Sequence, residues 1–241
     1  MDIKVIASGS TGNCYRISDG ETALMLECGI PLKEIEKGLA FALRDIQGCL
    51  VTHEHKDHSK AILDVMKASV DVYTSQGTIK TLSLNQSHRL HAIKALQQFY
   101  IGTWTILPFS TEHDATEPLG FLLYSNLTHE KLLFATDTYY VRYKFTGLTH
   151  TMIECNYSAD VLNNNLSAGL LDEQRKRRIM KSHFELSNVI GFLKANDLSS
   201  VNSIYLIHLS EQNSNADYFK KKVMAATGIP TYVAGKNGGA T

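Results

Sequence analysis

The stretch Thr52-His53-Glu54-His55-Lys56-Asp57-His58 follows directly after the apolar run Gly48-Cys49-Leu50-Val51. Its imidazoles and carboxylate suit zinc and other borderline transition metals. In an extended or tightly turned loop, side chains alternate with a period of two, so His53 and His55 project to one side. Asp57 and His58 follow as a second pair. The loop therefore offers ligands to two adjacent metal ions, and the alternative is a solvated cluster of surface histidines.

The composition describes an ordinary globular protein with no excess of either charge. The chain has 241 residues, 24 Lys+Arg and 24 Asp+Glu, so its formal net charge is zero. We therefore expect a single domain over residues 1–241 and no global basic footprint for nucleic acid, although a local patch is not excluded. The N-terminus lacks the apolar core of a signal peptide, and no apolar run is long enough to cross a bilayer. These features predict a cytoplasmic protein without a membrane partner.

The cysteines carry no metal or disulfide signature. Cys14, Cys28, Cys49 and Cys155 form no Cys-x-x-Cys pair, and each sits in or beside an apolar run. Buried, reduced thiols are the expected state.

The pattern of short apolar segments predicts an α/β fold. Strands are expected at residues 4–7, 14–17, 22–27, 48–51, 71–74, 97–101, 103–109, 119–124, 131–135, 151–154, 203–207 and 231–233. Helices are expected at residues 31–43, 59–68 and 76–84, and the last third is otherwise helical. This order indicates two mixed sheets sandwiched between outer helices.

Three isolated polar residues follow predicted strands farther along the chain. His113 comes after the strand that ends near Phe109, Asp137 follows residues 131–135, and His208 follows residues 203–207. Strand ends are where a rigid sheet can deliver side chains to one rim. Together with the loop 53–58, these residues supply enough ligands for two metal ions.

The order of these residues resembles the metallo-β-lactamase superfamily, whose hallmark is His-x-His-x-Asp-His followed by a later His, Asp and His. Further stretches look like the YycJ-like branch of that superfamily, whose members are described as exonucleases. They are residues 7–13, 113–118, 137–141, 154–156, 176–179 and 207–210. The resemblance covers nearly the whole chain and implies the αββα sandwich of the metallo-β-lactamase fold.

The resemblance also implies a dinuclear site. In it, His53, His55 and His113 hold one divalent ion, Asp57, His58 and His208 hold the other, and Asp137 bridges them. Zinc, manganese or iron fits this N/O ligand set. A hydroxide between the ions is the nucleophile, and Asp57 also orients it. Glu27 stands where the family usually has Asp, and we expect it to fix the histidine loop through hydrogen bonds.

Residues that would contact the substrate are less clearly marked. His183 matches a family position near the scissile phosphate, as a phosphate ligand or general acid, although Glu185 replaces the Ser that usually follows it. A helix-cap or surface role is the alternative. The basic run 175–178 is either a solvated helix face or a contact to a nucleic-acid backbone. The predicted substrate contacts are Ser10, Asn13, Asn156, Arg177, Arg178 and Ser210.

Three functions remain open at this point. The first is a metal-dependent phosphodiesterase, a DNA exonuclease acting in the 5′ to 3′ direction. The second is a hydrolase of a thioester, lactone or β-lactam on the same dinuclear site, because the fold does not fix the substrate. The third is a family member that only binds metal or nucleic acid, which the complete set of ligands disfavours.

Overall fold

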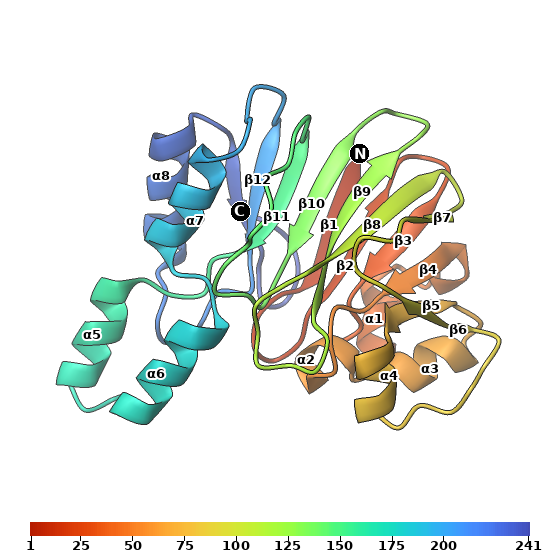
Figure 1. The fold of residues 1–241 in the computed structure, drawn as a ribbon, viewed down its shortest axis with the longest axis horizontal. Helices are drawn as coiled ribbons and strands as arrows, with labels where there is room; N and C mark the ends of the chain where they lie inside the picture. The colour runs from red at the N-terminus through yellow and green to blue at the C-terminus, as the bar shows by residue number, and fades with distance from the viewer.

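The computed structural model describes residues 1–241, which form two facing β-sheets with helices on both outer sides (Figure 1). The six-stranded sheet has the order β1-β2-β3-β4-β5-β6, and the seven-stranded sheet has the order β13-β12-β11-β10-β9-β8-β7. The strands of the first sheet are Asp2–Ala7, Cys14–Ser18, Ala23–Leu26, Ile46–Leu50, Val72–Ser75 and Leu90–Ile93. Those of the second, β7 to β13, are Phe99–Ile101, Trp104–Ser110, Leu119–Ser125, Lys131–Ala135, His150–Glu154, Ser203–Ile207 and Thr231–Val233.

Both sheets are mixed, which confirms the predicted α/β sandwich. Strands β1, β2 and β3 pair antiparallel, whereas β3 through β6 pair parallel. Likewise β7 through β10 are antiparallel, and β10 through β13 are parallel. Parallel neighbours place their carboxyl ends at one edge of a sheet, so residues that follow such strands can meet there.

The core is divided by the alternation of side chains along each strand. Leu50 of β4 packs between the sheets, whereas its neighbours Cys49 and Val51 belong to the apolar cluster of the outer layer. The inter-sheet layer includes Tyr15, Trp104 and other wholly buried residues of both sheets. Burial of this apolar surface, at about 25 cal/mol per Å², fixes the two sheets face to face.

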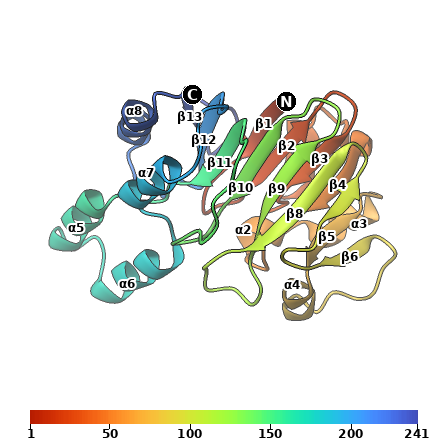
Figure 2. The same ribbon diagram turned by 45° about the horizontal axis from the view of Figure 1, so that its top comes forward.

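The outer layers are helical. Helices α1 Leu32–Gly38, α2 Lys56–Ser59, α3 Ile62–Lys67 and α4 Gln76–Thr81 lie on the side of the six-stranded sheet (Figure 1). Helices α7 Leu186–Lys194 and α8 Ala216–Thr227 cover the seven-stranded sheet, and α5 Ala159–Ser167 and α6 Glu173–Ser182 project from the body as a pair (Figure 2). A 3₁₀ turn spans Leu43–Asp45.

Several predicted boundaries were wrong. The helix expected from residue 31 to 43 ends at Gly38, because Ala40 and Phe41 adopt left-handed backbone angles with φ of 52° and 62°. The helix expected at 59–68 begins only at Ile62, and strand β6 was not predicted. The four cysteines are free and buried, as expected. None of the helices has the length and apolarity that crossing a membrane would demand.

Candidate metal centre

Backbone hydrogen bonds fix the position of the histidine loop. It leaves the sheet after β4 and passes into α2, where the N–H of Asn13 donates to the carbonyl of Asp57 at 2.8 Å. The N–H of Cys28 donates to the carbonyl of His58 at 2.9 Å. At Gly29 a Cβ would lie only 1.7 Å from the carbonyl oxygen of Asp57, so this close approach requires glycine.

The other predicted ligands arrive from strand ends of the seven-stranded sheet. His113 follows β8, Asp137 follows β10 and His208 follows β12. Asp137 and His208 adopt left-handed backbone angles, with φ of 44° and 53°. Such angles are uncommon for residues other than glycine and cluster at functional sites, where surrounding structure holds them. They turn both side chains toward the loop.

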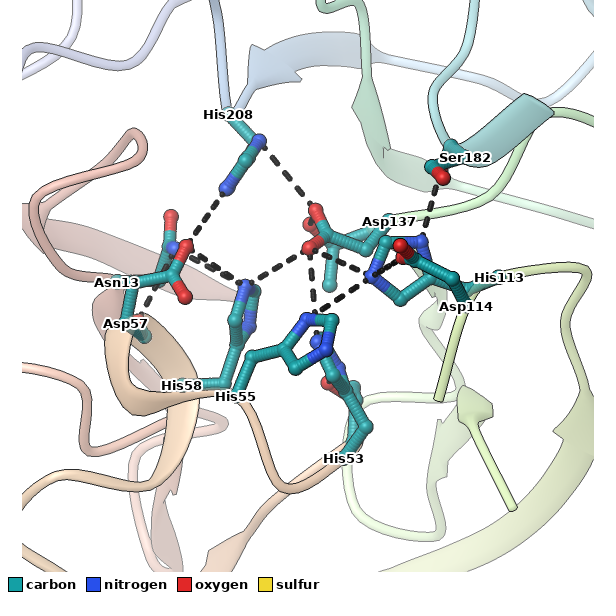
Figure 3. A network of polar contacts seen from close by, with 12 residues as sticks. Asn13, His53, His55, Asp57, His58, His113, Asp114, Asp137, Ser182 and His208 are labelled. Carbon is teal, nitrogen blue, oxygen red and sulfur yellow. Dashed lines mark hydrogen bonds and ion pairs between the residues drawn. The ribbon is translucent and has the colours of Figure 1, made fainter. Parts of the chain in front are cut away.

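The first group of converging ligands comprises His53, His55, His113 and Asp137 (Figure 3). Nδ1 of His55 lies 3.2 Å from Nε2 of His113. Oδ2 of Asp137 lies 3.4 Å from Nε2 of His113 and 3.6 Å from Nε2 of His53. These atoms all lie within 4.8 Å of one another, the spacing expected around a single ion.

The second group comprises Asp57, His58, His208 and again Asp137 (Figure 3). Oδ2 of Asp57 lies 3.4 Å from Nε2 of His58 and 3.2 Å from Nε2 of His208. Asp137 lies 3.1 Å from His58 through Oδ2 and 3.3 Å from His208 through Oδ1. The structure thus brings together all seven residues that the sequence proposes as ligands, with Asp137 common to both groups.

This arrangement fits a pair of bound cations. Nε2 of His53 is buried and has no hydrogen-bond partner, although buried polar atoms are nearly always paired. The imidazoles and carboxylates supply nitrogen and oxygen donors, which suit divalent transition metals without selecting one of them. His53, His55 and His113 would hold one ion, Asp57, His58 and His208 the other, and Asp137 would contact both.

Hydrogen bonds on the far side of the rings orient their inner nitrogens. His113 donates from Nδ1 to the carbonyl of Ser182 at 2.8 Å, and Nδ1 of His53 contacts Oγ1 of Thr52 at 2.9 Å. The buried Glu27 accepts from the N–H of Thr52 at 3.3 Å and lies 3.4 Å from Nδ1 of His58. Glu27 thus has the contacts expected of a residue that fixes the histidine loop.

The site concentrates opposite charges in a buried volume. Burial alone would raise the pKa of Asp137, but His208 and His58 hold the pKa of this carboxyl well below its usual value. Burial alone would lower the pKa of His208, but Asp137 and Asp57 raise the pKa of His208 to about 10. His53 has no such excess of negative neighbours, and its burial keeps its pKa well below the usual range. The metal-free centre therefore carries protons on part of its ligand set.

Metal loading should release protons. An imidazole binds metal only when neutral, and the raised pKa of His208 keeps it charged at pH 7 in the metal-free protein. Apparent metal affinity should therefore fall as the pH falls. Calorimetric titration of the metal-free protein with ZnCl₂ at pH 7, in two buffers with different protonation enthalpies, should give different heats. Equal heats in both buffers would contradict this prediction.

A buried carboxylate beside the centre was not predicted as a functional residue. Glu154 is wholly buried and accepts from Nδ1 of His183 at 2.7 Å and from the N–H of Thr138 at 2.9 Å. It ends β11 and so carries the same signal, a polar residue at a strand end, as the predicted ligands. Glu154, His183, Asp137 and His208 form a third group of converging donors. Glu154 thereby fixes the ring of His183 beside the centre.

A cavity of about 330 Å³ opens over the centre and includes most of the proposed contacts. Ser10, Asn156, Arg178, Ser210 and His183 line it, together with Arg175 of the basic run 175–178 and with Asn213, which the sequence did not single out. Asn13 and Arg177 do not line it. Asn13 is buried, and its amide donates to the carbonyls of Gly9 and Asp57 at 3.1 Å, so it holds the loops together.

Glu185, the departure from the family pattern, caps α7 by accepting from the N–H groups of Ser187 and Asn188.

Comparison with known families agrees with this fold and site. A family model described as "Beta-lactamase superfamily domain" matches residues 34–208, which include every predicted metal ligand. The chain belongs to the metallo-β-lactamase superfamily. Within it, the chain falls in the YycJ-like branch, as the relatives below indicate.

Two curated relatives and one solved structure illustrate this placement. Exodeoxyribonuclease YycJ of Bacillus anthracis is 28% identical over 241 aligned residues, covering 92% of this chain and 88% of that protein. Exodeoxyribonuclease WalJ of Streptococcus pneumoniae (strain D39) is 28% identical over 226 residues, covering 87% and 82%. The crystal structure of the metallo-β-lactamase fold protein YhfI from Bacillus subtilis superposes with a TM-score of 0.71, covering 98% of both chains at 16% identity. This last similarity concerns the fold alone.

Proposed function

We propose that this protein is a metal-dependent phosphodiesterase that removes nucleotides from DNA ends. The observation that carries the proposal is a single cavity lined by members of both ligand groups, by His183, and by Arg175 and Arg178 of α6. The relatives named exodeoxyribonucleases, 28% identical to this chain, support DNA as the substrate. The 5′ to 3′ direction rests on the resemblance to the YycJ-like branch alone.

The walls of the cavity suit a phosphate better than an acyl or β-lactam substrate. Ile179 is the sole hydrophobic residue in its lining. Arg175 supplies positive charge, as does Arg178, whose Nε also pairs with Asp114 at 3.3 Å. Ser10, Ser210 and the amides of Asn156 and Asn213 supply hydrogen-bonding groups. Small-molecule sites are usually lined mainly by apolar side chains, whereas arginine matches phosphate oxygens in charge and geometry. These walls therefore favour a phosphodiester over the carbonyl substrates considered above.

Bound divalent ions at such a centre lower the pKa of water and offset charge on the attacking and leaving oxygens. Asp57 lines the cavity, and its Oδ2 is engaged by His58 and His208. Its other oxygen can accept a hydrogen bond from the attacking water and orient it toward phosphorus. No serine or cysteine nucleophile is required, in keeping with the buried cysteines.

We propose that His183 protonates the leaving oxygen. Its Nδ1–H donates to Glu154 at 2.7 Å, which fixes the ring and leaves Nε2 for the substrate. Burial alone would lower the pKa of His183, but the charge of Glu154 raises it, which favours the protonated imidazole. A positioned acid of this kind contributes about 10² to 10⁴ in rate. We assign His183 the role of general acid and Glu154 the role of positioning residue.

The test is a metal-dependent cleavage assay on labelled substrates. Metal-free protein should be inactive on end-labelled DNA, and added Zn²⁺ or Mn²⁺ should restore stepwise release from one end. RNA, a lactone and a thioester serve as competing substrates. Turnover of the lactone or thioester with intact DNA would select the carbonyl hydrolase instead. If the fully metal-loaded protein turned over none of these substrates, it would be a family member that only binds metal or nucleic acid.

The arginines of α6 should determine how tightly DNA binds. Arg175→Ala and Arg178→Ala should raise the KM for an oligonucleotide, and each should lower the slope of log affinity against log salt by about 1. Arg177→Ala is the matched comparison, because Arg177 lies on the same helix but outside the cavity lining. Equal effects of all three substitutions would mean that α6 contributes only general charge. A larger effect of Arg177→Ala would support the substrate contact that the sequence predicts for Arg177, and would contradict the assignment based on the cavity lining.

A further inference from the structure

A second cavity lies beside the metal centre, between the chain that follows Asp137 and one face of α7. Its volume is about 460 Å³, and we call it the tyrosine groove. Tyr139 and Tyr140 line one side, and Ser187, Asn188 and Gly191 line the other. Asp137 and His183 line the catalytic cavity, whereas Tyr139 and Phe184, close to them in sequence, line the groove. The same two chain segments therefore border both cavities.

Two exposed aromatic side chains stand on a firmly held backbone at this groove. Tyr139 is 41% exposed and Tyr140 is 54% exposed, and neither ring packs against another aromatic ring or makes a side-chain hydrogen bond. The N–H of Thr138 donates to Glu154 at 2.9 Å, and the N–H of Tyr139 donates to the carbonyl of Glu112 at 3.1 Å. The hydroxyl of Thr138 donates to the carbonyl of Tyr140 at 2.6 Å. The rings are therefore presented by a preorganised segment and left without a partner in the chain.

The charge around the groove is positive. Arg142 and Lys144 line it, and no carboxylate does. Arg142 pairs through Nε with Glu112 at 2.6 Å, next to the metal-ligating His113 in sequence, whereas Lys144 makes no ion pair. Exposed aromatic rings combined with cations are the features that bind single-stranded nucleic acid, because bases stack on the rings and cations follow the backbone.

We propose that the tyrosine groove binds the base of an unpaired nucleotide in the strand whose phosphate lies in the metal centre. This inference rests on the proposed function, since it assigns a binding site for the nucleic acid that the centre would cleave. The base would stack on Tyr140, the more exposed of the two rings, and the side-chain amide of Asn188, which makes no hydrogen bond within the chain, would face its polar edge. An unpaired end would then bind more tightly than a fully paired one.

Gly191 keeps the groove open. It lies within α7, and a Cβ built on it would have no atom within 4 Å. Its backbone needs no left-handed angle, and leucine is a better helix former than glycine. A leucine at this position would therefore fill the groove while preserving the helix, without touching any proposed metal ligand.

The experiment uses the metal-loaded protein and compares wild type with Gly191→Leu and Tyr140→Ala. The KM for an oligothymidylate should rise about 10-fold in both variants, and kcat should change little. Turnover of bis(p-nitrophenyl) phosphate, which has no base, should stay at the wild-type level. Wild type should also prefer the oligothymidylate to an abasic oligomer of the same length, and both variants should lose that preference. Tyr100→Ala, which removes an exposed tyrosine from edge strand β7, is the matched control.

The outcomes separate this inference from the proposed function. If wild type cleaves DNA but both variants keep its KM and its preference over the abasic oligomer, the groove does not bind a base. If wild type cleaves no phosphodiester, the proposed function fails, and fluorescence anisotropy with labelled oligothymidylate and abasic oligomer then decides on the groove alone. Equal affinity for the two oligomers would overturn it. Thermal melting of Gly191→Leu confirms that any loss is not unfolding, and Tyr140→Ala provides the second, independent variant.

Discussion

Replacing His55 with alanine should remove metal and activity together. His55 belongs to the first ligand group, and its Nδ1 lies 3.2 Å from Nε2 of His113, so its loss leaves that ion with fewer nitrogen donors. Loss of an outer partner of a metal ligand typically costs 10- to 100-fold in metal affinity or activity, and loss of a ligand itself should cost more than about 100-fold. Elemental analysis of the purified variant, together with the DNA cleavage assay, measures both effects.

The matched control for this substitution is His88→Ala. His88 is exposed and belongs to none of the converging donor groups, so its removal should change neither metal content nor turnover. A His55→Ala variant that keeps two ions and wild-type turnover would exclude His55 from the site. Activity regained at high metal concentration would instead fit a weakened site, and would place the main effect of His55 on affinity.

Replacing His183 with alanine should lower the rate of DNA cleavage but, unlike His55→Ala, should leave the metal content unchanged. His183 lines the cavity and is held by Glu154, and it is absent from the two groups proposed to hold the ions. Removing a general acid should lower kcat by about 10² to 10⁴. Metal content by elemental analysis and kcat on a DNA oligonucleotide measure the two quantities in the same preparation.

Glu154→Gln tests how His183 is activated. The amide oxygen can still accept from Nδ1, but its neutral side chain no longer raises the pKa of His183. The alkaline limb of the kcat profile, where the general acid loses its proton, should therefore move to lower pH. If kcat of the variant were lower at every pH but its alkaline limb stayed at the wild-type pH, Glu154 would have only a structural role. Loss of metal in His183→Ala would mean that His183 is itself a metal ligand. The third group of converging donors, which contains His183 and Glu154, is compatible with that outcome.

Sequence reasoning identified the seven candidate ligands that converge in the structure, because their signals are local. The histidine loop is one short segment, and His113, Asp137 and His208 each follow an apolar run that was recognisable as a strand. Strands 131–135, 203–207 and 231–233 have the predicted limits. Glu154 is the last residue of such a strand, but its role depends on His183, 29 residues farther along the chain. Nothing near Glu154 in sequence reveals that contact.

The substrate contacts could be predicted only in part, because they depend on where elements begin. Helix α6 begins after Asp172, which caps it, and this start sets which arginines face the cavity. Arg175 and Arg178, three residues apart, share a face, whereas Arg177 is rotated away from it. Asn13 lies in a turn whose backbone, with Gly12 at a φ of 151°, directs its amide inward. Neither the phase of the helix nor the path of the turn can be read from residue types alone.

Gly29 packs against the backbone of Asp57, so the position of the histidine loop depends on main-chain contacts and not on the metal-binding side chains. Main-chain atoms of residues 13, 28 and 29 set where the loop sits, whichever side chains it carries. An engineer could therefore exchange individual imidazoles for carboxylates or thiolates to alter which element is captured, while the scaffold keeps its shape. Such a redesign would have to keep Gly29, because a Cβ at this position would collide with the carbonyl oxygen of Asp57.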